Sequence, residues 1–220
     1  MAISKLNFNS LNVTPTASKG IGFDSGADDL EASFSGGSMV FIKKLTASSS
    51  GTLSFVDGAS SVVLDNTYKE YVFIFNNMHP SATDIDGLTF QGSTDGGSNY
   101  NTAITSSYFR ATHDEDGSNG ALAYQASQDQ AQGTGFQNIG QSVGTDNDQS
   151  LAGTLQLFNP SSTTFVKHFI ARTNNAHPSD KSRDVFTSGY LNTTSAVDAI
   201  QFKMSSGNID AGTITLYGIT

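Results

Sequence analysis

The chain of 220 residues contains no cysteine. This absence excludes disulfide bonds, thiolate zinc sites and cysteine nucleophiles, so any metal ion here must be held by oxygen or imidazole ligands. No window approaches the roughly 18 consecutive apolar residues of a membrane helix. The first ten residues also lack the apolar core of a signal peptide. We therefore expect synthesis in the cytoplasm without an export signal, and no insertion into a membrane.

Charged side chains are scarce, at 14% of the chain against roughly a quarter in an average soluble protein. The net charge is -9, and the eleven basic residues are scattered along the chain. No basic patch is present through which counterion release could drive binding to DNA or RNA, so nucleic-acid binding is not expected. Ser, Thr, Asn and Gly instead make up 91 residues, which predicts an uncharged polar surface.

Hydrophobic residues alternate with polar ones at the period of two that is typical of β-strands. Near the end of the chain, Ile200, Phe202 and Met204 alternate with Gln201 and Lys203, and a turn-rich stretch then leads to a final strand. Strands are predicted at Met39–Leu45, Gly51–Val56, Glu70–Asn76, Gly87–Gly92, Tyr108–His113, Ala121–Ser127, Leu151–Phe158, Thr164–Arg172, Asp184–Leu191, Val197–Met204 and Gly212–Ile219. The pattern predicts an all-β fold, a single antiparallel β-sandwich of jelly-roll type.

Residues 1–37 have a different pattern, with isolated hydrophobic side chains among Ser, Asn, Gly and Asp. Spaced single hydrophobic residues cannot build a core of their own, so we interpret this region as an extended N-terminal arm that packs on a partner. The β-sandwich domain would then cover residues 38–220. A loosely draped terminus is the alternative interpretation.

Two short segments, Asn76–Ser81 and Asn174–Ser179, are identical at five of six positions. Both follow apolar strands, so each is expected to be a buried strand that runs into an Asx-type turn stiffened by proline. Their similarity raises the hypothesis of pseudo-symmetry between two halves of a sandwich. His79 and His177 would be paired ligands or pH sensors in one interpretation, and turn residues before proline in the other.

Acidic residues are concentrated in loops, and the pattern Asp-x-Asp-Gly occurs twice, at Asp84–Gly87 and Asp114–Gly117. Alternating carboxylates with a glycine at the bend can bring several oxygens together around a calcium ion. Neither copy continues to the bidentate glutamate of an EF-hand. Asp114 and Asp116 are the preferred candidate calcium ligands, with Asp146 and Asp148 as a second option. Solvated acidic turns are the alternative interpretation.

Catalytic motifs are missing from the sequence: it has no Gly-x-Ser-x-Gly elbow, no phosphate-binding glycine loop with lysine and no dinucleotide fingerprint. The triplet Asp24-Ser25-Gly26 lies in the predicted arm, where no hydrolase scaffold surrounds it. A pair of carboxylates for glycoside cleavage depends on the fold and stays open. We expect no enzymatic activity and, calcium apart, no cofactor.

A glycine-rich loop, Gln91–Asn101, is the best candidate for ligand binding. Sugar-binding surfaces combine aromatic rings, which cover the apolar side of a pyranose, with carboxylates and amides that bind its hydroxyl groups. The candidate ligand-binding residues are Asp95, Asn99, Tyr100, Asn101, Tyr108 and His113, with Arg110 and Tyr124 as extensions. A hairpin loop whose Tyr100 folds back on the sheet is the alternative.

The segments Ile3–Thr16, Asn159–His168, Ser205–Ile209 and Leu216–Ile219 resemble those of small virion proteins of marine tailed bacteriophages. The resemblance covers the whole chain and implies a location in the virion and a role in assembly or attachment. It supplies no site motif, so no functional residue is carried over.

Two functions follow as expectations. The first is a part of a tail fibre or tail appendage that attaches to the host, with a surface glycan as ligand. The second is a capsid decoration or connector protein that binds other virion proteins. Both imply a closed symmetric homo-oligomer, for which a trimer is expected.

Overall fold

The computed structural model of this chain describes residues 20–23, 30–34, 38–82 and 87–220. These residues form fifteen β-strands and no helix, which confirms the predicted all-β class. The chain divides into two units, Met1–Val40 and Phe41–Thr220. In the first unit, β1 (Gly20–Phe23) and β2 (Leu30–Phe34) pair antiparallel within the region predicted to be an arm. The other residues of that predicted arm lie outside the described part of the chain.

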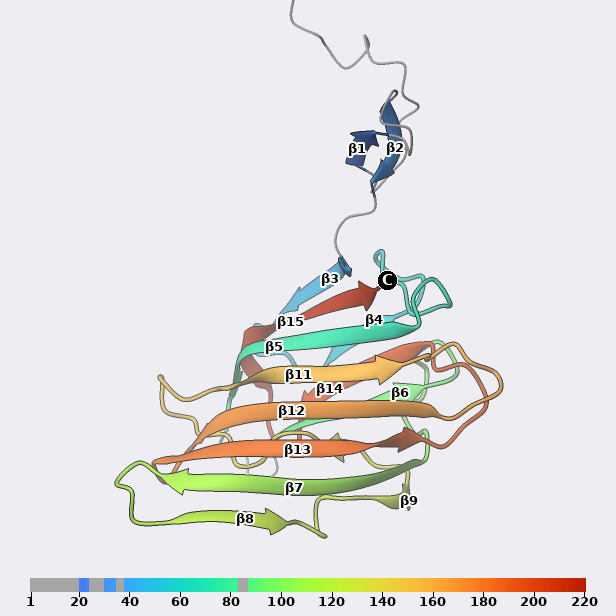
Figure 1. Cartoon of the computed structure of the whole chain (residues 1–220). Helices are drawn as coiled ribbons and strands as arrows, with labels where there is room; N and C mark the ends of the chain where they lie inside the picture. Colours follow the sequence, from blue (N-terminus) through green and yellow to red (C-terminus); the bar gives the residue numbers. More distant parts are fainter. Residues whose placement is uncertain (1–19, 24–29, 35–37, 83–86) are drawn as a thin grey trace, which may run out of the picture. The chain divides into compact units, whose positions relative to one another are not determined.

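The remaining strands form two antiparallel sheets that pack as a sandwich (Figure 1). The large sheet has the order β3 (Met39–Thr46), β15 (Ile209–Ile219), β5 (Glu70–Pro80), β11 (Leu151–Phe158), β12 (Lys167–His177), β13 (Lys181–Leu191), β7 (Ile104–Asp114) and β8 (Gly120–Tyr124), and β9 (Ala131–Gly133) also pairs with β7. The small sheet has the order β10 (Gln137–Asn138), β6 (Leu88–Ser93), β14 (Ala199–Met204) and β4 (Leu53–Val56). We call the face of the large sheet that is turned away from the small sheet its outer face.

Each of the eleven predicted strand windows overlaps an observed strand, but several strands are longer than predicted. β5 continues to Pro80 and β12 to His177, because neighbouring strands hydrogen bond to residues that the sequence indicated as turns. The short strands β9 and β10, and the pair β1 and β2, were not predicted. Alternation in β14 is confirmed, since Ile200, Phe202 and Met204 are buried.

The last two strands do not form a hairpin. β14 pairs with β4 and β6 in the small sheet, whereas β15 pairs with β3 and β5 in the large sheet. The turn between them therefore carries the chain from one layer of the sandwich to the other. The predicted strand at Gly212–Ile219 is confirmed as part of β15, which lies between β3 and β5 in the large sheet.

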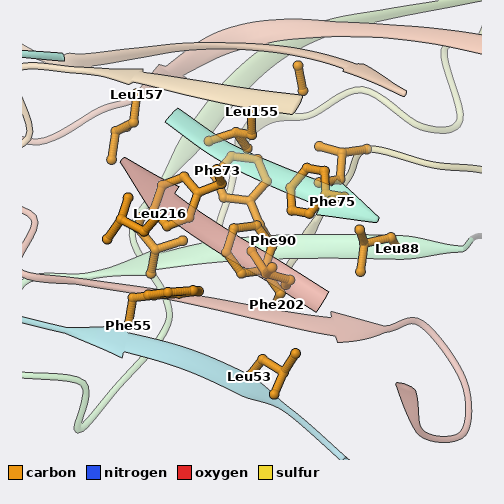
Figure 2. Packing of buried hydrophobic residues seen from close by; sticks show 14 of the residues in the cluster. Leu53, Phe55, Phe73, Phe75, Leu88, Phe90, Leu155, Leu157, Phe202 and Leu216 are labelled. Atoms are coloured by element: carbon orange, nitrogen blue, oxygen red, sulfur yellow. The ribbon is translucent and has the colours of Figure 1, made fainter. Parts of the chain in front are cut away.

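The core lies between the two sheets and is centred on aromatic rings (Figure 2). Phe202 from the small sheet makes edge-to-face contacts with Phe55, Phe73 and Phe75 at centroid distances of 5.2 to 6.3 Å. Phe90 packs on Phe169 at 4.8 Å. Such offset arrangements are the favoured geometry of aromatic pairs, and each buried ring removes a large apolar area from water. This cluster holds the two layers together.

The two similar segments flank the same strand of the large sheet. Leu155 of β11 pairs with Phe73 on one side and with Ala171 on the other, so the two neighbouring strands keep the 98-residue offset of the repeat. The registers differ at the ends, because a β-bulge at Asn77, which has a φ of 50°, shifts β5 by one residue. Both copies therefore belong to one sheet, and each is part of a strand that pairs with β11.

Candidate functional site

The glycine-rich loop after β6 is built around the carboxylate of Asp95. Its oxygens accept hydrogen bonds from the side-chain amide of Asn99 at 2.7 Å, the backbone N–H of Asn99 at 2.9 Å and the hydroxyl of Ser93 at 2.7 Å. Hydrogen bonds from Asn99 and then from Ser93 lower the pKa of Asp95 to about 2. Asp198 accepts the N–H of Gly96 and fixes the loop to the start of β14. Asp95 and Asn99 thus stabilise the turn.

Tyr100 is partly buried against Gly97, where an added Cβ would lie 2.8 Å from the tyrosine hydroxyl. Gly97 also has a φ of +79°, a conformation that favours glycine. This position matches the alternative in which Tyr100 folds back on the domain. Asn101 is exposed beside it, whereas Tyr108 is 0% exposed and belongs to the interior of the sandwich.

The structure does not bring the candidate ligand residues together. The loop with Asp95 and Asn101 leads into the start of β7 at Ile104, and His113 lies near the other end of that strand. At about 3.3 Å per residue, the nine steps from Ile104 to His113 span about 30 Å. One sugar ring could not contact both groups. Arg110 points to the inner face, and Tyr124 donates a hydrogen bond to Asp129 on the outer side of β8.

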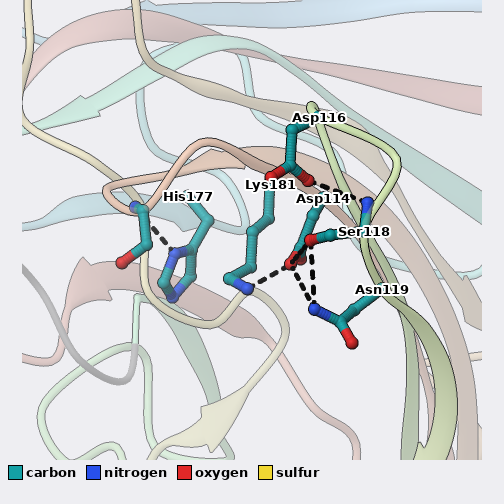
Figure 3. Close-up of polar contacts among 7 residues, drawn as sticks. Asp114, Asp116, Ser118, Asn119, His177 and Lys181 are labelled. Carbon is teal, nitrogen blue, oxygen red and sulfur yellow. Dashed lines mark hydrogen bonds and ion pairs between the residues drawn. The ribbon is translucent and has the colours of Figure 1, made fainter.

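The acidic turn between β7 and β8 uses its carboxylates in local contacts (Figure 3). Asp114 pairs with Lys181 at 2.7 Å and accepts hydrogen bonds from Asn119 and Ser118 at 3.2 and 3.3 Å. Asp116 accepts the N–H of Ser118 at 2.8 Å. Lys181 is the main cause of the lowered pKa of Asp114, and hydrogen bonds from Ser118 lower the pKa of Asp116. These contacts stabilise the hairpin.

Within residues 38–82 and 87–220, no three His, Asp or Glu side chains converge as metal ligands. Among the described residues, Asp114 and Asp116 are therefore not joined by a third carboxylate or imidazole group, and the calcium hypothesis stays a prediction. Asp84 and Asp86, the other pair, lie outside the described residues. Asp148 lines a cavity of about 380 Å³ together with His79 and Asp210, and the carbonyl of Asp146 lies 3.4 Å from His79 Nε2.

The two histidines of the repeat have different surroundings. Nδ1 of His79 lies 3.8 Å from the carboxylate of Asp210 on β15. His177 accepts the N–H of Ser179 at Nδ1, at 3.0 Å, which is the turn role expected of a residue before proline. Burial, followed by the charges of Arg183, Lys181 and Arg110, lowers the pKa of His177 to about 4. His79 lies on β5 and His177 on β12, and β11 separates these two strands. The two imidazole rings therefore have different partners.

A groove on the outer face of the large sheet was not predicted. It has a volume of about 500 Å³, crosses β12, β13 and β7, and also reaches the end of β11. We call it the outer groove; its outward-facing side chains are Thr105, Ser107, Phe158, His168, Ile170, Ser188 and Tyr190. The register explains the hollow, because Ile170 pairs with Ser188, which pairs with Ser107, and two adjacent serines leave space above the sheet.

Two rows of aromatic side chains, each running across neighbouring strands, border the outer groove. On one side, His168 and Tyr190 contact each other edge to face at 5.9 Å. On the other side, Phe186 stacks on Phe109 at 4.8 Å, and the guanidinium of Arg172 covers the second face of Phe186. Tyr124 continues this row on β8 as the register partner of Phe109. The groove is thus a trough between two rows of rings.

The chemistry of the outer groove suits a neutral ligand with apolar faces and hydroxyl groups. The residues that line it include no Asp, Glu, Lys or Arg. Hydroxyl groups of Ser107 and Ser188 lie 3.3 Å apart at its base, and Ile170 beside them is 53% exposed. Its volume falls within the roughly 300 to 1,000 Å³ of small-molecule sites. The groove can therefore place apolar contacts and hydrogen bonds around one ligand.

The comparisons with known proteins add no relative. No family model, no curated protein and no solved structure was found to match the chain. In the part of the chain that the structure describes, no helix is long and apolar enough to cross a membrane.

Proposed function

We propose that this chain is a non-enzymatic structural protein of a phage virion, part of a tail fibre or tail appendage, and that its outer groove binds a neutral glycan on the host surface. The observation that carries the binding role is the uncharged trough between two aromatic rows. Pyranose rings pair apolar faces with hydroxyl groups, which is the combination that this trough accepts.

Support for the virion comes from the sequence, because the resemblance to small virion proteins of marine phages covers both ends of the chain. The two-layer antiparallel sandwich fits such a role, and a jelly-roll-type connection of its strands belongs to the same proposal. The proposal also includes an N-terminal arm that docks on other virion proteins, and assembly of the chain into a symmetric homotrimer. In this arrangement the β-sandwich carries the ligand site and the arm anchors it.

A second function, decoration or connection of the capsid, is favoured by the edge of the large sheet. The edge strand β8 carries no charged residue, and Leu122 on it is 73% exposed. Unpaired backbone groups and exposed apolar side chains on an edge strand are a template for contact with another subunit. This function would use the β8 edge in place of the outer groove.

A glycan array tests the binding role. Wild-type protein should bind a subset of neutral glycans, and Ser188→Phe should lose that binding because the new ring fills the outer groove. The matched control is Ser182→Phe, on the same strand and the same face but outside the groove. Absence of wild-type binding, or equal binding by Ser188→Phe, would reject the groove as a glycan site.

A cryo-EM map of the intact particle tests the location. Density for the sandwich at the tail, with the outer groove facing away from the particle, is the expected result. Density on the capsid shell with the β8 edge against a neighbouring subunit would reject attachment and support decoration. Absence of the chain from purified particles would reject both virion roles.

A further inference from the structure

Two arginines meet on the inner face of the large sheet, far from the outer groove. Arg110 on β7 donates a hydrogen bond from Nη1 to the side-chain oxygen of Gln141, and Arg183 on β13 donates from Nη1 to the backbone carbonyl of Gln141 at 3.1 Å. Gln141 lies in the segment between β10 and β11 that covers this part of the sheet. Because both guanidinium groups donate to Gln141, they lie close to each other.

Among residues 38–82 and 87–220, neither arginine has a carboxylate partner. The ion pairs of the described chain involve Arg172, Lys181 and His79. Arg183 is only 5% exposed, and burial together with the nearby Arg110 charge lowers its pKa to about 10. A buried cation without a counter-charge is costly. The chain has 20 acidic and 11 basic residues, so a lack of acidic residues in the sequence does not explain why these two arginines have no ion-pair partner among the described residues.

Two buried polar atoms beside the pair have no hydrogen-bond partner among the described residues: Nε of Arg183 and Oδ1 of Asn175. These residues are direct register partners on β13 and β12. A bridging water would satisfy this donor and this acceptor, but it would leave both positive charges uncompensated. An anion would satisfy the Nε–H and the charge together, whereas Oδ1 of Asn175, an acceptor, would still need a donor such as a water molecule. His177 follows on the same face of β12.

We infer that Arg110 and Arg183 form a binding site for an oxyanion, either a carboxylate or a tetrahedral sulfate or phosphate group. The planar guanidinium fork presents paired N–H donors that match these groups. Arg110 is partly exposed, so the anion would approach the buried Arg183 from the side of Arg110. The site is independent of the proposed glycan function, because the outer groove lies on the opposite face and has no charged lining residue.

Thermal unfolding of the full chain tests the site. At pH 7.5 and constant ionic strength, chloride is replaced by acetate, sulfate or phosphate. A bound anion stabilises the native state by mass action, so Tm should rise with saturation, by about 3 to 6 °C at ten times Kd. The larger response to acetate would identify a carboxylate site, and the larger response to sulfate or phosphate a tetrahedral one.

Sulfate and phosphate also stabilise proteins without binding, but that effect does not saturate. Arg110→Gln should abolish the saturable rise, and Arg110→Lys should weaken it because a lysine lacks the planar fork. Arg172→Gln is the matched control, since Arg172 lies on the outer face and pairs with Asp184. It should keep the wild-type saturation.

Direct evidence does not require a variant. In NMR spectra of wild-type protein, the Nε–Hε signal of Arg183 should shift with the same anion concentration that saturates Tm. A rise in Tm that is linear in anion concentration, equal in wild type and Arg110→Gln, with no shift of the Arg183 signal, would overturn the site.

Discussion

Phe169 and Ile170 are neighbours on β12, yet they face opposite sides of the large sheet. Phe169 is fully buried and packs on Phe90 of the small sheet. Ile170 lies on the outer face, in the outer groove, and is 53% exposed. Both faces of the sheet carry apolar side chains, and within the unit Phe41–Thr220 the small sheet covers the inner face. Apolar residues of the inner face therefore stabilise the fold, and we propose that those of the outer face contact a ligand.

The largest effect is expected in the aromatic core. Phe202→Ala should lower the free energy of unfolding by about 3 to 5 kcal/mol, because it removes a ring that contacts Phe55, Phe73 and Phe75 and leaves a cavity. Ile170→Ala, the outer-face control, should cost about 1 kcal/mol or less. Urea denaturation of the two variants measures the difference. Equal losses would contradict the assignment of the faces.

The second largest loss of stability is expected for a buried polar residue on the inner face of the large sheet. Thr173 is 1% exposed, and its hydroxyl donates a hydrogen bond to the carbonyl of Ile139. Thr173→Val keeps the shape but leaves that carbonyl unpaired, which should cost about 1 to 3 kcal/mol. Thr154→Val on the exposed outer face should change little. If denaturation gives the same free energy for both variants, the hydrogen bond does not stabilise the fold.

The pH dependence of stability should report on the inner-face residue His177. Its pKa is lowered from 6.5 to about 4 in the folded state, so between these values the unfolded chain binds more protons. Stability should therefore fall as the pH drops from about 6.5 towards 4, by on the order of 1 to 2 kcal/mol once screening of the partly exposed ring is considered. His177→Gln should reduce this loss. An unchanged pH profile of Tm in the variant would contradict the assigned cause.

The smallest effect on stability is expected for the outer face. Ser188→Phe and Ser182→Phe place a ring on exposed positions of β13, and each should change the free energy of unfolding by about 0.5 kcal/mol or less. Circular dichroism with thermal melting checks this expectation. A loss of several kcal/mol in Ser188→Phe would show that the outer groove is part of the packed structure.

The strands could be predicted from the sequence because alternation is a local signal. Period two says which side chains share a face, as it did for Ile200, Phe202 and Met204 of β14. It does not say which strands pair, so the passage of the chain from β14 in one sheet to β15 in the other was missed. Strand ends were also misjudged, since the residues His177 and Pro80 that indicated turns are held in strands by neighbours.

The candidate site was harder to predict for two physical reasons. Carboxylates and amides in glycine-rich loops, such as Asp95 and Asn99, look the same in sequence whether they bind a ligand or stabilise a turn. The outer groove combines residues from four strands, and Ser107 and Ser188 reveal nothing until the register places them side by side. The only local signal was Phe169-Ile170, an apolar pair that indicates a strand with apolar residues on both faces.

Competition for attachment tests the central claim most directly. Host cells are incubated with purified chain and then with phage particles, and free particles are counted. Wild-type chain and Ser182→Phe should block adsorption to the same extent, and Ser188→Phe, although folded, should block it at least tenfold less effectively, as expected from the loss of about 1.4 kcal/mol of binding energy. Failure of the wild type to block adsorption, or equal blocking by Ser188→Phe, would contradict attachment through the outer groove.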